Sequence, residues 1–236
     1  MIGQWESATE LWQLLDPMGR TWSRNAYRPG YAEYRYALFC FYQGNLTEAY
    51  LAQIEELVRQ GKGRLLIRWL HSLCGEWSLE RGDSEAAAKS LRIAVLMARE
   101  VGQSDANAET GLAVAQLHLG QLDDARREAE RLTSAKERAN RLLAELWVLV
   151  RDREQATKHA LAAYKWAWAD GEPYVRRYEL NKATELLDRL GVEIPKLPPY
   201  DPEKAEKIPC EDEVIAFIEK LKREKADKEA AKKTPE

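Results

Sequence analysis

Three glycines recur every 38 residues, and this period constrains the fold more than any other feature of the chain. Gly44, Gly82 and Gly120 each open a short polar stretch that ends in alanine: GNLTEA, GDSEAA and GQLDDA. A fixed period of roughly 20 to 50 residues is typical of stacked arrays, in which each unit buries its apolar face against its neighbours. We therefore expect helical hairpins that place a glycine at the turn and small residues where the two helices cross.

The small residues of these units together resemble the tetratricopeptide repeat (TPR) family. The matching positions are Ala37, Gly44 and Ala49 in one unit, Gly75, Gly82, Ala87 and Ala94 in the next, and Ala113, Gly120 and Ala125 in the third. A fourth stretch keeps Ala144, Ala156, Ala160 and Ala163 but has Arg151 where the turn glycine belongs. The resemblance covers roughly residues 30 to 170, and it implies an all-α fold: a right-handed α-α superhelix of about four TPR-like helical hairpins with capping helices.

The TPR consensus unit has about 34 residues, so the longer period implies longer second helices or longer connections. Lengthened units of this kind are similar to the TPR sensor arms of bacterial signal-transduction ATPases of the STAND type. The resemblance implies a protein- or peptide-binding scaffold, serving as a sensor or assembly module of a larger signalling system. An alternative is the regulatory arm of such an ATPase, with its nucleotide-binding domain outside this chain.

Composition divides the chain into five expected segments. Residues 1–29 form an N-terminal amphipathic helix and a basic, aromatic connector, residues 30–172 the repeat array, residues 173–194 a capping helix, residues 195–210 a proline-rich strap, and residues 211–236 a C-terminal helix with a charged tail. Dense proline forbids helix and favours an extended strap.

The C-terminal helix carries a narrow apolar stripe made of Val214, Phe217, Ile218 and Leu221. A short isolated helix is marginal in water, so we expect this stripe to dock on another surface. The first expectation is that it folds back onto the array itself. The alternatives are a stripe that belongs to a separate partner, or self-association through the terminal helices.

Bulk properties exclude several classes of function. The net charge of −3 gives no general attraction to nucleic acid or to anionic membranes. No apolar run approaches the length of a membrane span, and the N-terminus lacks the pattern of a signal peptide. We expect a cytoplasmic protein with no membrane partner.

No constellation of residues predicts catalysis or metal binding. The candidates are Cys40, Cys74, Cys210, His71, His118 and His159. The cysteines are too few and too scattered for a zinc site or a disulfide framework, and the histidines fall in three different units without a ligand pattern. We expect neither an enzyme nor a cofactor.

The TPR resemblance also implies which residues line the inner groove, because first-helix residues one turn apart face it. These are Tyr31, Tyr34, Leu38, Trp69, Ser72, Glu76, Asn107, Thr110, Val114, Arg138, Arg141 and Glu145. Arg138 and Arg141, with Arg176 or Arg177, are expected on an exposed wall where they could receive an acidic group. The lysine and asparagine clamp that some family members use for a C-terminal carboxylate is not matched, since Tyr34 and Leu38 occupy those positions.

A cluster of arginines and aromatic residues near the N-terminus offers an alternative function. It comprises Arg20, Trp22, Arg24, Tyr27, Arg28, Tyr31, Tyr34, Arg35 and Tyr36. Such residues can hold single-stranded nucleic acid by stacking and cation–π contacts. The same tyrosines also follow a helical stripe, and in a slightly acidic chain we favour packing over nucleic-acid binding.

Overall fold

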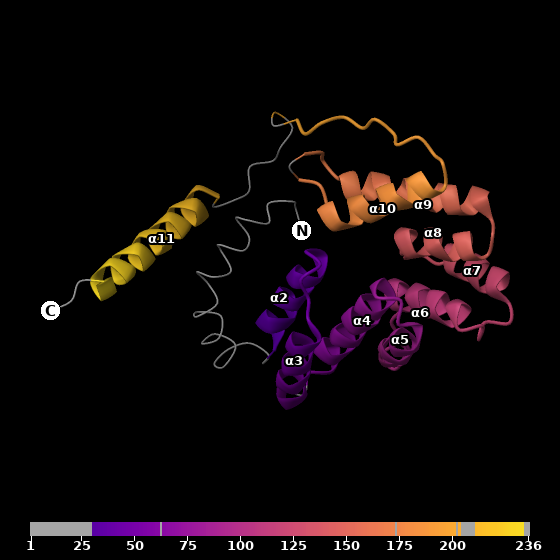
Figure 1. Cartoon of the computed structure of the whole chain (residues 1–236), viewed down its shortest axis with the longest axis horizontal. Helices are drawn as coiled ribbons and strands as arrows, with labels where there is room; N and C mark the ends of the chain where they lie inside the picture. The colour runs from indigo at the N-terminus through magenta and orange to yellow at the C-terminus, as the bar shows by residue number, and fades with distance from the viewer. Residues whose placement is uncertain (1–29, 62, 173, 202, 204–210, 234–236) are drawn as a thin grey trace.

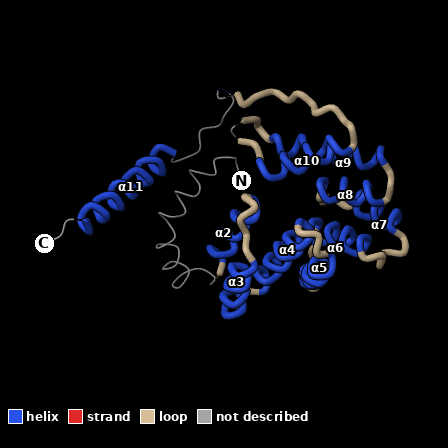
Figure 2. Tube along the Cα trace, viewed as in Figure 1, coloured by secondary structure: helices blue, strands red, loops and turns tan. Residues whose placement is uncertain are grey.

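The computed structural model describes residues 30–61, 63–172, 174–201, 203 and 211–233. Within these ranges the chain is all-helical, with ten helices and no strand (Figures 1 and 2). The helices are α2 (Tyr31–Tyr42), α3 (Glu48–Gly61), α4 (Arg64–Glu80), α5 (Ser84–Arg99), α6 (Ala106–His118), α7 (Ala125–Thr133), α8 (Asn140–Leu149), α9 (Arg153–Trp168), α10 (Arg177–Arg189) and α11 (Glu211–Lys233). The expected N-terminal helix and most of the arginine–aromatic cluster lie outside the described residues.

Helices α2 to α9 pack as successive hairpins, which gives the fold a repeat-like character. Each of the pairs α2–α3, α4–α5, α6–α7 and α8–α9 is in contact, and α4–α6 and α6–α8 contacts join one pair to the next. Figure 1 shows the helices following one another around an arc, with α10 facing α4 across its inside. The arc determines which side chains meet on the inner face.

The turns between paired helices fall where the glycine period predicts them. Gly44, Gly82 and Gly120 have φ angles of 73°, 75° and 65°, in the left-handed region that suits glycine. Arg151 occupies the fourth turn with a φ of 63°, so it adopts the glycine-like conformation despite its side chain. The hairpin boundaries are thus confirmed, including the one that lacks glycine.

Aspartates cap four of the helices in one repeated way. Asp83, Asp105, Asp124 and Asp152 each accept a hydrogen bond from the backbone N–H three residues later. An N-cap of this kind satisfies one of the unpaired N–H groups at a helix start and typically stabilises it by about 1 kcal/mol. Short polar residues after each turn therefore explain why α5, α6, α7 and α9 begin where they do.

Small residues allow close helix crossings in the second unit but not equally in the first. Ala87 and Ala94 are both 0% exposed, as expected where α4, α5 and α6 pack together. Ala49, at the same offset in the first unit, is exposed on α3. The expectation of a nested Ala49 is wrong, because α3 turns Leu51 and Ile54 inward instead.

The C-terminal end of the array is capped by α10 and by an extended segment. Leu180 and Leu187 of α10 are buried against α9 and α8. The segment 192–201 then runs back without helical structure (Figure 2), and the Trp168 indole donates a hydrogen bond of 2.8 Å to the carbonyl of Pro198. Residues 195–201 of the strap form no helix, as their prolines predict.

Helix α11 stands apart from the array (Figure 1), and its apolar stripe is not buried on it. Val214 and Phe217 remain 54% and 48% exposed. The expected fold-back onto the array is therefore wrong, since α10 and the strap already cover the apolar face of α9. The helix also continues to Lys233, well past the end of the stripe at Leu221.

Candidate functional site

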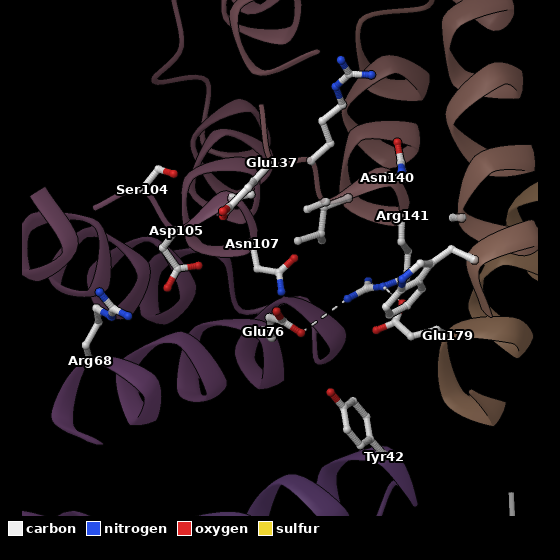
Figure 3. Close-up of a pocket in the computed structure, with 16 residues that line it drawn as sticks. Tyr42, Arg68, Glu76, Ser104, Asp105, Asn107, Glu137, Asn140, Arg141 and Glu179 are labelled. Atoms are coloured by element: carbon white, nitrogen blue, oxygen red, sulfur yellow. Dashed lines mark hydrogen bonds and ion pairs between the residues drawn. The ribbon is translucent and has the colours of Figure 1, made fainter. Parts of the chain in front are cut away.

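A cavity of about 430 Å³ lies on the inside of the arc (Figure 3). Each first helix of the four hairpins contributes to its walls, with Tyr42 of α2, Glu76 of α4, Asn107 of α6 and Arg141 of α8, and helices α9 and α10 complete them. Figure 3 shows Tyr42 and Glu76 on one side and Asn107 on the other, with Arg141 reaching in from α8. The repeated hairpin geometry thus gathers side chains from distant parts of the sequence into one concave surface.

Arg141 is the centre of this surface, and four glutamates surround its guanidinium group. Its Nε lies 3.0 Å from Glu179, Nη2 lies 3.4 Å from Glu76, and Nη1 lies 3.4 Å from Glu145 and 3.7 Å from Glu80. Only 7% of Arg141 is exposed. We call these five residues the Arg141 cage; it connects α4, α8 and α10 through one buried cation.

The Arg141 cage holds more carboxylates than the nearby cations neutralise. Lys182 adds a second cation by pairing with Glu80, which leaves four carboxylates facing two positive charges. Burial raises the pKa of Glu76 to about 7, against the opposing influence of Arg141. Burial also raises the pKa of Glu145. The inside of the arc is therefore an acidic, partly desolvated environment in which the protonation state of Glu76 changes near neutral pH.

Arg141 itself stays charged within the cage. Burial alone would lower its pKa, but the carboxylates of Glu179, Glu76 and Glu145 outweigh that effect and hold the pKa above its ordinary value. A buried charge paired in this way is costly to expose or to leave unpaired. The guanidinium thus acts as a fixed structural cation.

Tyr178 of α10 closes the arc against the first two hairpins. Its hydroxyl donates a hydrogen bond of 2.9 Å to Glu80, and its ring centroid lies 5.1 Å from that of Phe41 and 5.0 Å from that of Tyr42. Burial raises the pKa of Tyr178 above its ordinary value, so the phenol stays neutral and can act as the donor. The two ends of the array are therefore held together by aromatic packing and hydrogen bonding.

A second cavity of about 230 Å³ lies on the other side of the cage. Glu76, Arg141 and Leu142 border both cavities, while Val114 and Glu145 border only the smaller one. The Arg141 cage therefore divides the space inside the arc into two compartments.

Half of the predicted groove residues line these two cavities. They are Glu76, Asn107, Val114, Arg138, Arg141 and Glu145. Ser72 is half-buried on α4, whereas Thr110 is 1% exposed and belongs to the interior of α6 rather than to a binding wall. First-helix periodicity alone therefore does not specify which of the predicted residues stay accessible.

The predicted aromatic end of the groove forms a separate packed cluster. The ring of Tyr34 stacks on that of Trp69 with centroids 6.0 Å apart, and Tyr31 lies 6.4 Å from the same ring. Tyr34 is 9% exposed, and Leu38 packs against the same core. These residues hold α2 on α4, which leaves Tyr34 unavailable for stacking on a base.

The predicted basic wall is not assembled. Arg141 was expected to be exposed, and that expectation is wrong because the four glutamates bury it. The guanidinium carbon of Arg176 lies 4.1 Å from the centroid of the Trp166 ring. The Nη2 atom of Arg177 lies 2.7 Å from the carboxylate of Glu172. Among these four arginines, Arg138 is exposed and forms no ion pair, its Nε donating to a backbone carbonyl. An acidic ligand group in the larger cavity would thus meet the exposed Arg138 and the half-buried Arg68 beside several carboxylates.

Sequence reasoning missed Glu80, Glu179, Tyr178 and Tyr42. The spacing of Glu76 and Glu80, four residues apart on one helix, places both carboxylates on one face and was a usable signal. Glu179 follows Arg141 by 38 residues, one repeat period, and this spacing was a second usable signal. Tyr178 gave no such signal, because its contact with Glu80 depends on the curvature that brings α10 to α4.

Other chemical functions gain no support within the described ranges. No group of three or more histidine, cysteine, aspartate or glutamate side chains there is placed to hold a metal ion. Cys74 is a buried free thiol, and burial raises its pKa to about 12. None of the helices in this part of the chain combines the length and the apolar character that crossing a membrane requires.

Comparisons with models of known protein families, with curated proteins and with solved structures found no match. The geometry of the chain itself is therefore the basis for a functional proposal.

Proposed function

We propose that this chain is a TPR-type scaffold, a right-handed superhelix of helical hairpins that binds a protein or peptide segment on its inner face. One observation carries the proposal: the first helices of all four hairpins, α2, α4, α6 and α8, contribute to the lining of the cavity of about 430 Å³, together with α9 and α10. This is the lining that the TPR resemblance implies, and cavities of this size accommodate one or two side chains.

The charge distribution favours a peptide that inserts a lysine or arginine side chain. Glu76 and Glu179 both line the larger cavity, and the two carboxylates share the single cation of Arg141. A cation beside Glu76 would favour its ionised form and so lower its raised pKa. Tyr42, whose hydroxyl points toward the cavity in Figure 3, adds a phenolic oxygen that can accept a hydrogen bond from a cationic side chain.

The rim of the cavity supplies polar groups for the peptide backbone. Asn107 and Arg138 are exposed there, and an amide and a guanidinium can hydrogen-bond the carbonyls of an extended chain. A deep acidic subsite with a polar rim gives such a site both charge selectivity and orientation. In this proposal the chain acts as a sensor or assembly module of a larger signalling system.

Selection from a random peptide display library tests the proposal. We expect enrichment of peptides with one central lysine or arginine, and their synthetic, end-capped versions should bind in calorimetry. Replacing that residue by glutamate should weaken binding at least tenfold. Glu179→Gln should weaken the cationic peptide, whereas Glu185→Gln, which lies outside the larger cavity, should not. Enrichment of acidic peptides, or the absence of any selected peptide, would contradict the proposal.

A further inference from the structure

Helix α11 exposes an apolar face that no part of the described array covers. Val214, Ile215 and Phe217 are 54%, 53% and 48% exposed, and Ile218 and Leu221 continue the same face as half-buried residues. Figure 1 shows α11 as a single straight helix away from α2–α10. A contiguous apolar face of this kind marks an interaction surface.

The charges beside this face follow a pattern that complements itself. Glu213 precedes the apolar face, and Lys220 follows one heptad later, so both lie along the same flank of the helix. Both residues are exposed; Lys220 lies 3.9 Å from Glu224 of its own helix, and 71% of its side chain remains accessible. When two such helices pair antiparallel about a two-fold axis, equal flanks face each other. Glu213 of each copy then lies beside Lys220 of the other.

A parallel pair has the opposite electrostatics. It would bring the acidic first turns, which contain Asp212 and Glu213, together at one end and the lysine-rich halves together at the other. Like charges in these positions repel. When Glu213 of one copy lies opposite Lys220 of the other, the two-fold axis passes close to Phe217 of both helices. The apolar faces of the two copies then overlap.

We propose that α11 is a self-association helix that pairs antiparallel with α11 of a second copy of this chain. The pair buries Val214, Phe217, Ile218 and Leu221 of both copies, and Glu213–Lys220 contacts on the flank set its direction. The interface is small, so the dimer is weak and depends on concentration and on salt. It leaves the cavities of the array free, because their walls come from α2–α10.

Sedimentation velocity of the full chain under reducing conditions, over a wide concentration range, tests this inference. The unmodified protein should form dimers as concentration rises, and Phe217→Ser should raise the dimer dissociation constant at least tenfold. Glu213→Lys and Lys220→Glu should each weaken the dimer, whereas the double variant Glu213→Lys/Lys220→Glu should restore it. Arg223→Glu, on the opposite face of α11, serves as the matched control and should leave the dimer unchanged.

The variants Glu213→Lys and Lys220→Glu distinguish the antiparallel α11 pair from any other dimer interface. Circular dichroism must show equal helix content in all variants, and Lys220→Glu lies far enough from the helix start to avoid disturbing the N-terminal dipole. A protein that stays monomeric at all concentrations would overturn the inference and would assign the face to a different partner. A dimer that Phe217→Ser or the single charge reversals leave intact would also overturn it.

Discussion

Gly75 lies so close to Leu91 that a Cβ atom on residue 75 would come within 2.3 Å of the leucine Cγ. Leu91 is 0% exposed, and its Cγ lies near the base of the side chain, so a shift of one methyl group does not relieve this contact. We therefore expect Gly75→Ala to destabilise the protein by about 2 kcal/mol, because overpacking outweighs the roughly 1 kcal/mol that alanine gains in helix propensity. Urea unfolding measures this difference.

The same leucine provides the control. A Cβ at Gly111 would lie 3.2 Å from the Leu91 Cδ1 methyl, which a small shift accommodates. Gly111→Ala should therefore change stability little, and Gly75→Ala/Leu91→Ala should show strong coupling between the two sites. Equal effects of the two glycine substitutions would contradict the assigned α4–α5 crossing.

Ala87 and Ala49 occupy the same position in successive units but differ in burial. Ala87→Leu should destabilise the array by about 1–3 kcal/mol, since a larger side chain cannot fit at a residue that is 0% exposed. Ala49→Leu, on the exposed face of α3, should cost less than about 0.5 kcal/mol. Thermal melts of the two variants compare the positions directly. Matching losses at both sites would mean that the two units pack alike.

Arg141 should be essential for stability, in contrast to the exposed Arg138. Arg141→Met would leave four buried or half-buried glutamates without their shared cation, and removing one partner of such a group typically costs about 3–5 kcal/mol. Arg138→Met should leave the unfolding curve unchanged. If Arg141→Met proves as stable as the unmodified protein, the cage is not formed in solution.

The raised pKa of Glu76 predicts that stability depends on pH. The folded protein holds a proton on Glu76 up to about pH 7, whereas the unfolded chain releases it near its ordinary value of 4.5. The free energy of unfolding should therefore fall as pH rises from about 4.5 to 7 and then level off, by up to about 3 kcal/mol for this group. Denaturant unfolding at several pH values measures the slope.

Glu76→Gln isolates this contribution, because glutamine keeps the shape of the side chain without the ionisation. The variant should show a smaller decrease across the same pH range, with the remainder due to Glu145, whose pKa burial also raises. Parallel pH profiles for the variant and the unmodified protein would rule out a shifted Glu76.

The hairpins could be predicted from sequence because their determinants are local. A left-handed turn needs glycine or an accommodating residue, and an aspartate cap acts within one helical turn, so Gly82 and Asp105 are recognisable without a structure. The exposure of Ala49 could not be predicted in this way. It depends on how α3 is rotated against α2, which the repeat pattern alone does not specify.

The candidate site was less predictable because it depends on accumulated geometry. Small rotations between hairpins add up around the arc until α10 reaches α4, and this brings Tyr178 and Lys182 to Glu80. The sequence correctly predicts that Arg141 faces inward, but its charge alone suggests an exposed anion receptor. Only the approach of α10 shows that the arginine is already neutralised and that the accessible subsite is acidic.

The docked strap provides the last prediction, through Gly171. This residue has a φ of 91°, and a Cβ on it would lie 2.6 Å from the backbone nitrogen of Tyr200. Gly171→Ala should therefore detach the strap from the end of α9 and weaken the hydrogen bond between Trp168 and Pro198. Trypsin should then cleave after Lys196 several-fold faster, because proteolysis requires a strap that is free to leave the surface. Mass spectrometry quantifies this single cut.

Gly191→Ala is the matched control. The φ of Gly191 is also positive, at 63°, but the atom nearest to an added Cβ is the end of a flexible arginine side chain at 3.5 Å. Both substitutions strain the backbone, so equal cleavage rates in the two variants would show that contact with Tyr200 does not hold the strap in place.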